Sequence, residues 1–360
     1  MARALRVLES TPLIDGHNDL PWEIRESEIA PHDVEATGHD LRSRTPFHTD
    51  IERLRAGRVG AQFWSVYIPY EAVEEGAAKT QLEQIDIAQQ VIRKYPEVLE
   101  QAFDASDVQR IFASRKIASM LGMEGGHAIE NSLGALRAFY AMGVRYMTLT
   151  HNGTLDWADA AMDERRHAGL TEFGREVVRE MNRLGMLVDL AHTSPETMND
   201  ALDVAEAPVI WSHAGARGVH DHPRNVPDQV LRRLPTNGGV VMVVFYPPFL
   251  TSADRAVLAD VADHIDHVAN LAGIDHVGIG SDFDGMEVTP VGLEDVSTFP
   301  ALFAELSRRG WSEDELAKLA GENVLRVMRE AETAARRLQR TRPPSVATIE
   351  ELDGPPEGRR

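Results

Sequence analysis

The feature that most constrains the fold is a regular alternation of short apolar runs with longer stretches of helical periodicity. Eight of these runs are rich in β-branched residues and have the length of buried strands, at 13–19, 61–68, 118–124, 146–151, 187–192, 209–213, 239–245 and 276–282. Helical patterns lie around 80–95, 130–142, 172–185, 195–206, 254–272 and 295–309. Eight strands with helical crossovers predict an α/β fold, a closed (β/α)8 TIM barrel.

The expected domain organisation is simple. A chain of 360 residues with 43% hydrophobic content can bury one large core, so residues 1–341 are expected to form a single barrel domain. The first strand is expected to follow Met1 directly. The last helix is expected to begin at Ser312, where Glu315 completes a capping box, and to end near Leu338. Residues 342–360 contain two Pro-Pro pairs and predict a polar tail that does not fold independently.

Composition excludes several kinds of function. Thirty-seven basic against 57 acidic residues give a net charge of −20, and no dense basic run is present, which argues against a nucleic-acid partner. The chain has no cysteine, so any metal must be held by His, Asp or Glu. No apolar run is long enough to span a membrane and no signal-peptide core is visible, so we expect a cytoplasmic protein without a membrane partner.

Metal-binding side chains stand where the predicted strands end. His17 and Asp19, two residues apart, share one face of the first strand, although such a pair taken alone is more often an ordinary hydrogen-bonded pair. Glu124 ends the third strand, and a lone buried glutamate is otherwise paired with an arginine. His192 and His213 end the fifth and sixth strands. These five ligands suit two zinc ions that share one ligand, and Glu124, with two carboxylate oxygens, is the natural bridge.

Lysine is scarce, which narrows the chemistry further. The chain has only Lys79, Lys94, Lys116 and Lys318, and none of them ends a predicted strand. Their absence from the strand ends argues against a carbamylated lysine that bridges the metals and against Schiff-base lyase chemistry.

Further polar residues are placed for a reaction. His151 ends the fourth strand and suits polarisation of a carbonyl or stabilisation of an oxyanion, the alternative being a core histidine. Asp282 ends the eighth strand and suits proton transfer from a metal-activated water to a leaving amine. Arg224 follows the sixth strand and suits a substrate carboxylate, the alternative being a surface arginine. We expect Asp284 to orient its loop and Asp15 to support a ligating histidine.

Taken as a set, the motifs resemble those of the membrane or renal dipeptidase family of zinc peptidases. The resemblance runs from Leu13 to about Met328. It rests on Asp-Gly-His-Asn-Asp-Leu-Pro-Trp (15–22), Glu-Gly-Gly-His (124–127), Leu-Thr-His-Asn (149–152), Asp-Leu-Ala-His (189–192), Trp-Ser-His (211–213), Arg-Asn-Val-Pro-Asp (224–228) and Gly-Ser-Asp-Phe-Asp-Gly (280–285).

The resemblance implies a metallo-dependent hydrolase barrel with two Zn²⁺ per chain. It places one zinc on His17, Asp19 and Glu124 and the other on Glu124, His192 and His213. It further implies that His151 contacts the scissile carbonyl, that Arg224 binds the C-terminal carboxylate of a dipeptide, and that Asp282 moves the proton. Members of the family hydrolyse dipeptides, accept a D-residue at the C-terminal position and in some cases open β-lactam rings. Many form homodimers, so a homodimer is an expectation here.

This chain departs from the family pattern in two respects. Mammalian members carry disulfides and a lipid anchor, whereas a chain without cysteine or leader and with a polar tail is expected to be a bacterial intracellular relative. The family's carboxylate-binding tyrosine aligns with Phe249, so we expect Tyr246 to compensate or Arg224 to carry more of the binding.

The resulting hypothesis is dipeptide hydrolysis by attack of a zinc-bridging hydroxide, with His151 stabilising the tetrahedral intermediate and Asp282 transferring the proton. One alternative is a binuclear barrel hydrolase for a lactone, cyclic amide or phosphoester. The other is a barrel that binds metal or ligand without turnover.

Overall fold

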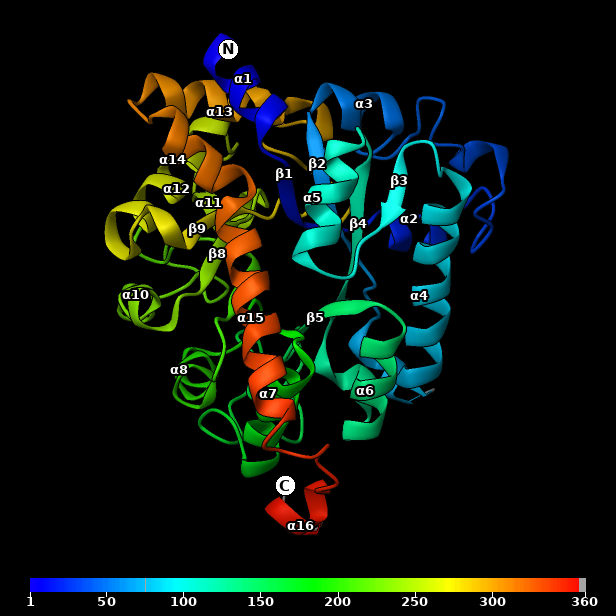
Figure 1. Ribbon diagram of the computed structural model, residues 1–360, viewed down its shortest axis with the longest axis vertical. Coiled ribbons are helices and arrows are strands. Elements are labelled where there is room, and N and C mark those ends of the chain that lie inside the picture. The colour runs from blue at the N-terminus through cyan, green and yellow to red at the C-terminus, as the bar shows by residue number, and fades with distance from the viewer. Residues whose placement is uncertain (75, 356–360) are drawn as a thin grey trace.

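The strands close into a barrel in the computed structural model, which describes residues 1–74 and 76–355. Eight parallel strands form it, and pairing of the last with the first closes the circle (Figure 1). In order around the barrel they are β1 (Leu13–Asn18), β2 (Val59–Ser65), β4 (Ile117–Glu124), β5 (Val144–Thr148), β6 (Leu187–Asp189), β7 (Ile210–Ala214), β8 (Val240–Val243) and β9 (Val277–Ile279). The predicted barrel and its eight strands are confirmed.

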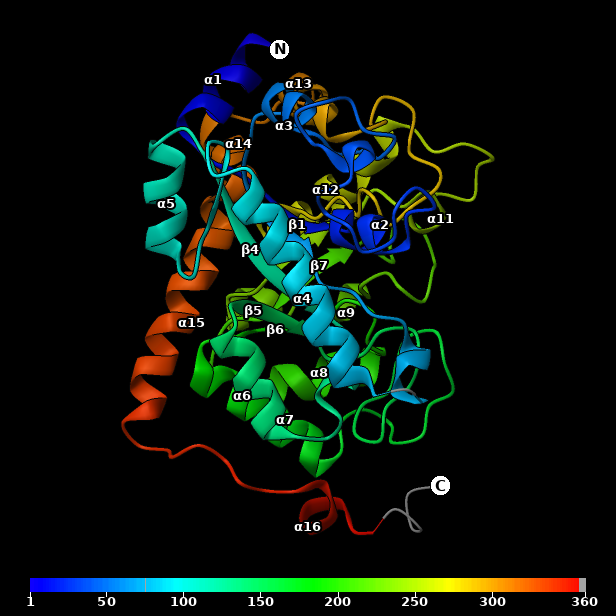
Figure 2. The ribbon, with the colours of Figure 1, turned by 90° about the vertical axis from the view of Figure 1, so that its right-hand side faces the viewer.

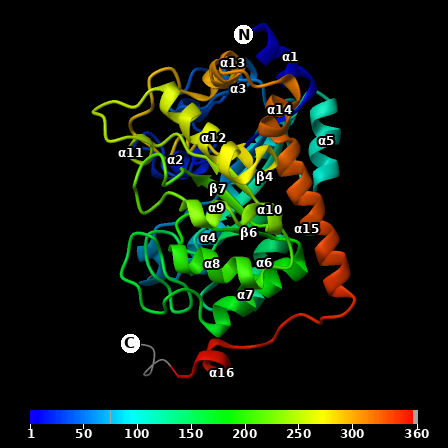
Figure 3. The same ribbon diagram turned by 90° about the vertical axis from the view of Figure 1, so that its left-hand side faces the viewer.

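Helices surround the strands, and the six predicted helical stretches are confirmed with shifts of a few residues at their ends. These helices are α4 (Ala77–Lys94), α6 (Leu133–Ala141), α7 (Glu172–Leu184), α8 (Pro195–Val204), α12 (Leu258–Ala272) and α13 (Phe299–Arg308) (Figures 1 and 3). Shorter α-helices lie in the connections, namely α2 (Leu20–Glu26), α3 (Ile51–Ala56), α5 (Ala105–Ala113), α9 (Asp228–Leu231), α10 (Leu234–Asn237) and α11 (Pro247–Leu250). The 3-10 turns are η1 (Thr37–His39), η2 (Tyr70–Glu74), η3 (Gly126–Ile129), η4 (Ile274–His276) and η5 (Val296–Thr298).

Helix α7 illustrates why these segments are helical. Phe173, Val177 and Met181 recur every four residues and form a buried stripe. The Thr171 side chain accepts a hydrogen bond from the backbone of the first turn, and Gly185 ends the helix in the left-handed conformation that glycine adopts at low cost.

Several elements were not predicted from the sequence, including a helix before the first strand and a short strand outside the barrel. Residues before the first strand form α1 (Ala2–Ser10), not a direct lead into β1, because Ala4, Val7 and Leu8 provide a buried helical stripe against α13 and α14 (Glu313–Ala317). The short strand β3 (Leu99–Gln101) pairs with β4 alone among the described strands and lies outside the barrel. At three residues, β3 is too short for a detectable pattern.

The C-terminal region follows the predicted helix and then differs from the predicted tail. Ser312 and Glu315 form the expected capping box at α14, a π-helical turn η6 (Lys318–Glu322) follows, and α15 (Asn323–Gln339) runs along the barrel (Figure 3). Residues beyond it pass beneath α7, where α16 (Ile349–Asp353) docks (Figure 2). Ile349 is buried, and Asp353 accepts hydrogen bonds from the start of α7. The rest of the predicted tail, 356–360, lies outside the described residues.

Glycines allow opposite walls of the barrel to approach. A Cβ atom at Gly280, just after β9, would lie 1.8 Å from the carbonyl oxygen of Ser212 on β7, and one at Gly16 on β1 would lie 2.5 Å from the same oxygen. Neither strand is a sheet neighbour of β7, so these contacts cross the interior. The close approach brings the ends of β1, β7 and β9 together.

No helix among the described residues is long and apolar enough to cross a membrane. The cytoplasmic location, the homodimer and the boundary of the catalytic domain at residue 341 stay predictions.

We expect Gly280→Ala to destabilise the fold by about 3 kcal/mol, because the added methyl group meets backbone that cannot move independently. Chemical denaturation measures this change. Gly134→Ala is the control, since its Cβ in α6 meets nothing closer than 3.4 Å and should be neutral or stabilising by up to about 1 kcal/mol. Equal stability of the two variants would contradict the proposed close contact.

Candidate metal centre

The predicted ligands converge at the carboxyl ends of the barrel strands. His17 lies in β1 with Asp19 directly after it, Glu124 ends β4, and His213 lies in β7. His192 follows β6 by three residues. All five side chains are buried, although the segments that carry them are far apart in the sequence. The barrel therefore collects them at one rim, as the pattern predicts.

Glu124 lies at the centre of this group. One of its carboxylate oxygens, Oε2, lies 3.4 Å from His17 Nε2, while Oε1 lies 3.0 Å from His192 Nε2 and 3.3 Å from His213 Nε2. His17 Nε2 is also 3.2 Å from Asp19 Oδ2. The two oxygens of one carboxylate thus face two different sets of ligands.

The cluster has the properties of a metal site. Its ligand atoms fall into overlapping groups, among them His17 with Asp19 and Glu124, and Glu124 with His192 and His213. Ligands about 2 Å from a tetrahedral zinc ion are about 3.3 Å apart, close to the separations seen here. His17 Nε2 and Asp19 Oδ1 are buried and have no hydrogen-bond partner in the part of the chain that the structure describes, which is costly unless a cation satisfies them.

The electrostatics of the cluster suit metal ligation. Burial lowers the pKa of His192 and His213 well below the usual value, so both imidazoles are neutral. Burial alone would raise the pKa of Glu124, but the surrounding histidines hold it well below its usual value and keep the carboxylate ionised. Burial also opposes protonation of His17, but the carboxylates of Asp19 and Glu124 contribute to a pKa well above its usual value.

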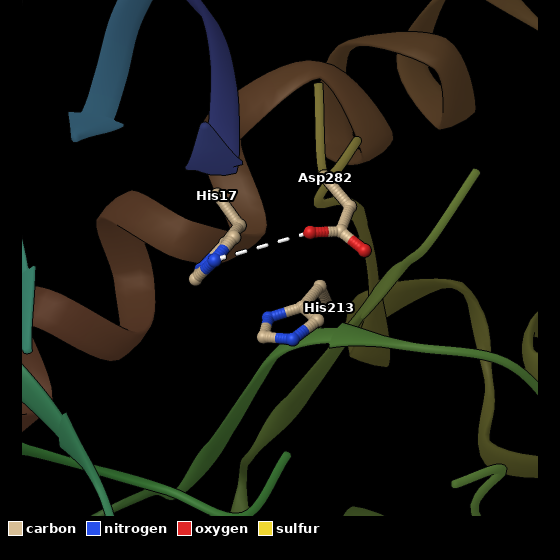
Figure 4. Close-up of side chains that lie close together, drawn as sticks. All are labelled: His17, His213 and Asp282. Carbon is tan, nitrogen blue, oxygen red and sulfur yellow. Dashed lines mark ion pairs between the residues drawn. The ribbon is translucent and has the colours of Figure 1, made fainter. Parts of the chain in front are cut away.

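Asp282 and His151 lie beside the cluster, beyond the ends of their strands. Asp282 Oδ1 is 4.0 Å from His17 Nε2, and Figure 4 shows the Asp282 carboxylate and the His213 ring close together on one side of the His17 ring. His151 Nε2 is 3.8 Å from Glu124 Oε1. Burial, reinforced by Asp19 and Glu124, raises the pKa of Asp282 well above its usual value, whereas burial lowers the pKa of His151 to about 4. The Asp282 carboxylate is therefore a stronger base than an ordinary aspartate, and the His151 imidazole is neutral.

The backbone contributes to these positions in a way that the sequence pattern did not reveal. The predicted strands include His151, His192 and Asp282, but β5, β6 and β9 end three residues earlier in each case. His192 and Asp282 have φ values of 66° and 69°, in the left-handed region that side chains rarely adopt. The turn directs both side chains toward the metal cluster, at a cost in backbone strain.

Three residues that the sequence analysis missed form hydrogen bonds with the Nδ1 atoms of the three ligand histidines. Tyr146 Oη lies 2.8 Å from His17 Nδ1, Asn152 Oδ1 lies 3.2 Å from His192 Nδ1, and Ser212 Oγ lies 2.9 Å from His213 Nδ1. Such partners orient the ring and leave Nε2 free for the metal. Asn152 and Ser212 are sequence neighbours of histidines in the motifs, so the sequence offered a signal for them. Tyr146 lies inside the barrel and in none of the motifs, so the sequence offered no signal for it.

The structure shows how Asp284 and Asp15, the two aspartates predicted to support the site, are bonded. Asp284 accepts a hydrogen bond from His48 N at 2.5 Å and donates its own N–H to His48 Nδ1 at 2.9 Å, which confirms that it orients a loop. Asp15 contacts a ligating histidine, as expected, but through the backbone, because its Oδ1 accepts a hydrogen bond from His17 N at 3.4 Å. Its carboxylate also accepts from Ser281 N and Ser281 Oγ, both at 2.7 Å, and ties β1 to the segment after β9.

A cavity of about 750 Å³ opens onto the cluster and also contains Arg224. The Arg224 side chain is only 2% exposed, and none of its three guanidinium nitrogens has a hydrogen-bond partner among the described residues. Its guanidinium lies 5.1 Å from the centre of the Phe249 ring, which also packs edge-on against Tyr246. The alternative of a surface arginine is therefore excluded. Burial lowers the pKa of Arg224 to about 10, so the side chain is still charged near neutral pH.

The cavity also contains residues that the ligand pattern did not predict. Trp22 packs edge-on against Tyr67 with ring centres 4.8 Å apart, and Tyr67 lies 4.9 Å from the His151 ring. Glu23 lies in the same wall, and burial together with Asp284 and Asp19 raises its pKa to about 7. Trp22 belongs to the motif at 15–22, which was the available signal.

Together, the closed barrel and the buried cluster of carboxylates and histidines define a metal-dependent hydrolase. Comparison with known proteins agrees. Residues 1–342 match the family model described as membrane dipeptidase, peptidase family M19. A Schizosaccharomyces pombe protein described as an uncharacterized dipeptidase is 48% identical over 341 residues, covering 91% of this chain and 82% of that protein.

Two solved structures extend the comparison. The probable dipeptidase PvdM from Pseudomonas aeruginosa superimposes with a TM-score of 0.84 at 24% identity, covering 93% of this chain and 98% of that one, and shows the shared fold. A metallo peptidase from Rhodobacter sphaeroides, liganded with a phosphinate mimic of the dipeptide L-Ala-D-Ala, superimposes with a TM-score of 0.79 at 25% identity, covering 89% and 99%.

The chain belongs to the membrane dipeptidase family, peptidase family M19, and is a metallo-dipeptidase that acts on peptide bonds. The relative from Schizosaccharomyces pombe is fungal, so it lends no support to the expected bacterial origin.

We expect Glu124→Gln to lose metal from both ligand sets, because each carboxylate oxygen faces one of them. Elemental analysis after dialysis against buffered zinc measures the content. The wild-type protein should also melt at a lower temperature after chelation, since a ligand at 1,000 times its Kd stabilises by about 4 kcal/mol. Glu180→Gln, which disrupts a buried ion pair with Arg183, is the control and should lower stability without loss of metal. Full metal content in Glu124→Gln would contradict the bridging arrangement.

Proposed function

We propose that the protein hydrolyses dipeptides with a free C-terminal carboxylate, tolerates a D-residue at that position and uses two zinc ions. The observation that carries the proposal is the buried Arg224 guanidinium, which lacks an internal partner and lies in the same cavity as the ligand cluster. A buried cation of this kind requires an anion, and a substrate carboxylate matches its planar fork. The dipeptide mimic bound by the Rhodobacter sphaeroides relative supports the same class of substrate.

The two groups of ligand residues support one zinc ion each. His17, Asp19 and Glu124 would hold one zinc ion, and Glu124, His192 and His213 the other. Zinc held by these residues would supply an acidic water as the nucleophile and a Lewis acid for the peptide carbonyl.

Arg224 and Tyr246 orient the substrate. The carboxylate accepts hydrogen bonds from the Arg224 guanidinium, whose position is restricted by the Phe249 ring. Phe249 has no hydroxyl at the place where the family pattern has tyrosine, so Tyr246, which packs against Phe249 and lines the cavity, is assigned the second contact. Fixing one end of the dipeptide brings its peptide bond toward the ligand cluster.

His151 stabilises the charge that develops on the carbonyl oxygen. Its pKa near 4 keeps the imidazole neutral, so it donates one N–H hydrogen bond without competing with the metals as a cation. Its ring lies beside His192, with ring centres 4.3 Å apart, so the donor stands next to the second ligand set.

Asp282 transfers the proton. It lies next to His17, and its raised pKa means that it accepts a proton from the attacking water and holds it until the amine leaves. The reaction steps balance, because the proton that Asp282 takes from the water is the one that it delivers to the leaving nitrogen.

The proposed function is tested by a panel of L,L and L,D dipeptides and their C-terminal amides, assayed before and after chelation, together with zinc content. We expect chelator-sensitive cleavage of free dipeptides and little cleavage of amides. Arg224→Met should lower kcat/KM for free dipeptides about 100-fold or more, because a buried charged contact is lost, and should leave the amides unaffected. Arg217→Met is the control, since this arginine on the same loop pairs with Asp221 outside the cavity.

Two outcomes would count against the proposal. Equal cleavage of free and amidated dipeptides would remove the carboxylate requirement. Two zinc ions without any dipeptide cleavage would favour a different substrate for the same barrel.

Asp282→Asn should reduce kcat about 100-fold or more with zinc content unchanged, because the amide cannot accept the proton. Steady-state kinetics and elemental analysis on the same sample measure both. Asp282 also forms a possible metal-binding group with His17 and His213, so loss of a zinc ion in this variant would instead make it a ligand. Nearly intact turnover with full zinc content would show that another group moves the proton.

A further inference from the structure

Tyr146 reaches across the barrel interior to a metal-site histidine. Its side chain starts on β5 and is fully buried, yet its hydroxyl lies 2.8 Å from His17 Nδ1 and 3.1 Å from the Gly16 carbonyl oxygen, both on β1. Strands β4 and β2 separate β5 from β1 in the wall of the barrel. The contact is therefore made through the core and not along the rim.

The core is shaped around this ring. A Cβ atom at Gly122 on β4 would lie 2.0 to 2.4 Å from Tyr146 ring atoms and the hydroxyl, so only glycine leaves room there. On another side Phe63 of β2 packs against the ring, with ring centres 5.1 Å apart. Close packing of this kind holds the hydroxyl at one place.

The hydrogen-bond pattern gives that hydroxyl a direction. The Gly16 carbonyl can only accept, so the Tyr146 proton goes to it, and the phenol oxygen then accepts the proton on His17 Nδ1. This is the arrangement in which both contacts are satisfied, and it leaves Nε2 as the ring nitrogen that would bind a metal beside Asp19 and Glu124.

We propose that Tyr146 is a positioning residue that fixes the tautomer and ring orientation of His17, and so sets the metal affinity of one ligand set selectively. The inference rests on the proposed assignment of His17, Asp19 and Glu124 as that set. The second set does not share this support, because its histidines are held by Asn152 and by Ser212, whose hydroxyl donates to Asp189 at 2.6 Å.

The test is the zinc affinity of Tyr146→Phe, measured by competition with a chromophoric chelator. Removing only the hydroxyl should weaken zinc at one of the two positions 10- to 100-fold and leave the other unchanged. Tyr95→Phe is the matched control, because this tyrosine is equally buried and its hydroxyl accepts from Leu41 N at 2.9 Å outside the cavity. It should bind both zinc ions as the wild type does.

Asn152→Ala provides the reciprocal variant and should weaken the position that contains His192. Under limiting chelator, Tyr146→Phe and Asn152→Ala should each retain one tightly bound zinc ion. Cobalt substituted for zinc reports which site has changed, since loss from the two ligand sets gives different absorption spectra.

Wild-type affinity at both positions in Tyr146→Phe would overturn the proposal, as would equal weakening of both. If that variant does not fold, nitrogen NMR of the zinc-loaded wild type decides, since the His17 proton must be on Nδ1, and a proton on Nε2 would overturn the proposal. Zinc binding is measured apart from hydrolysis, so failure of the dipeptidase assay alone rejects the substrate assignment and leaves the role of Tyr146 standing.

Discussion

The structure around the candidate site depends on a single carboxylate placed among three imidazoles. Glu124 directs one oxygen to His17 and the other to His192 and His213. A buried carboxylate is costly, and the cluster tolerates it because positive charge, from protons or from metal, surrounds it. Asp19 and Asp282 add two more carboxyl groups, whereas Arg224 is the only arginine or lysine among the described residues of the cavity wall. These side chains therefore have a strong requirement for cations, which divalent metal meets.

The barrel makes this arrangement possible by bringing distant strand ends within a few ångströms. Close approach across the interior depends on residues without side chains, since a Cβ at Gly280 or Gly16 would overlap the Ser212 carbonyl. The absence of a side chain at Gly122 similarly leaves room for the Tyr146 ring. The same interior thus combines packing with orientation of the ligands, so substitutions far below the rim affect the site through geometry alone.

The ligands and the barrel were predictable because both follow from simple periodicity. Polar residues that end buried apolar runs meet at one rim, so His17, Glu124 and His213 could be placed together without coordinates. Features that depend on contacts between distant segments were not predictable. The docking of α16 and the contact between Tyr146 and His17 involve residues more than 100 positions apart. The positive φ of His192 and Asp282 leaves no mark in the sequence, because neither is a glycine.

The charges in the cavity argue for catalysis beyond binding. A protein that only stored metal would gain nothing from a buried guanidinium without a partner, because desolvating it destabilises the fold. Nor would it benefit from a carboxyl group whose pKa is raised well above its usual value at the edge of the ligand cluster. A hydrolase would use both, with Arg224 in its proposed role as the substrate anchor and Asp282 in its proposed role as the proton carrier. The unfavourable burial of these two side chains is therefore best explained by a role in binding and hydrolysing a short anionic substrate.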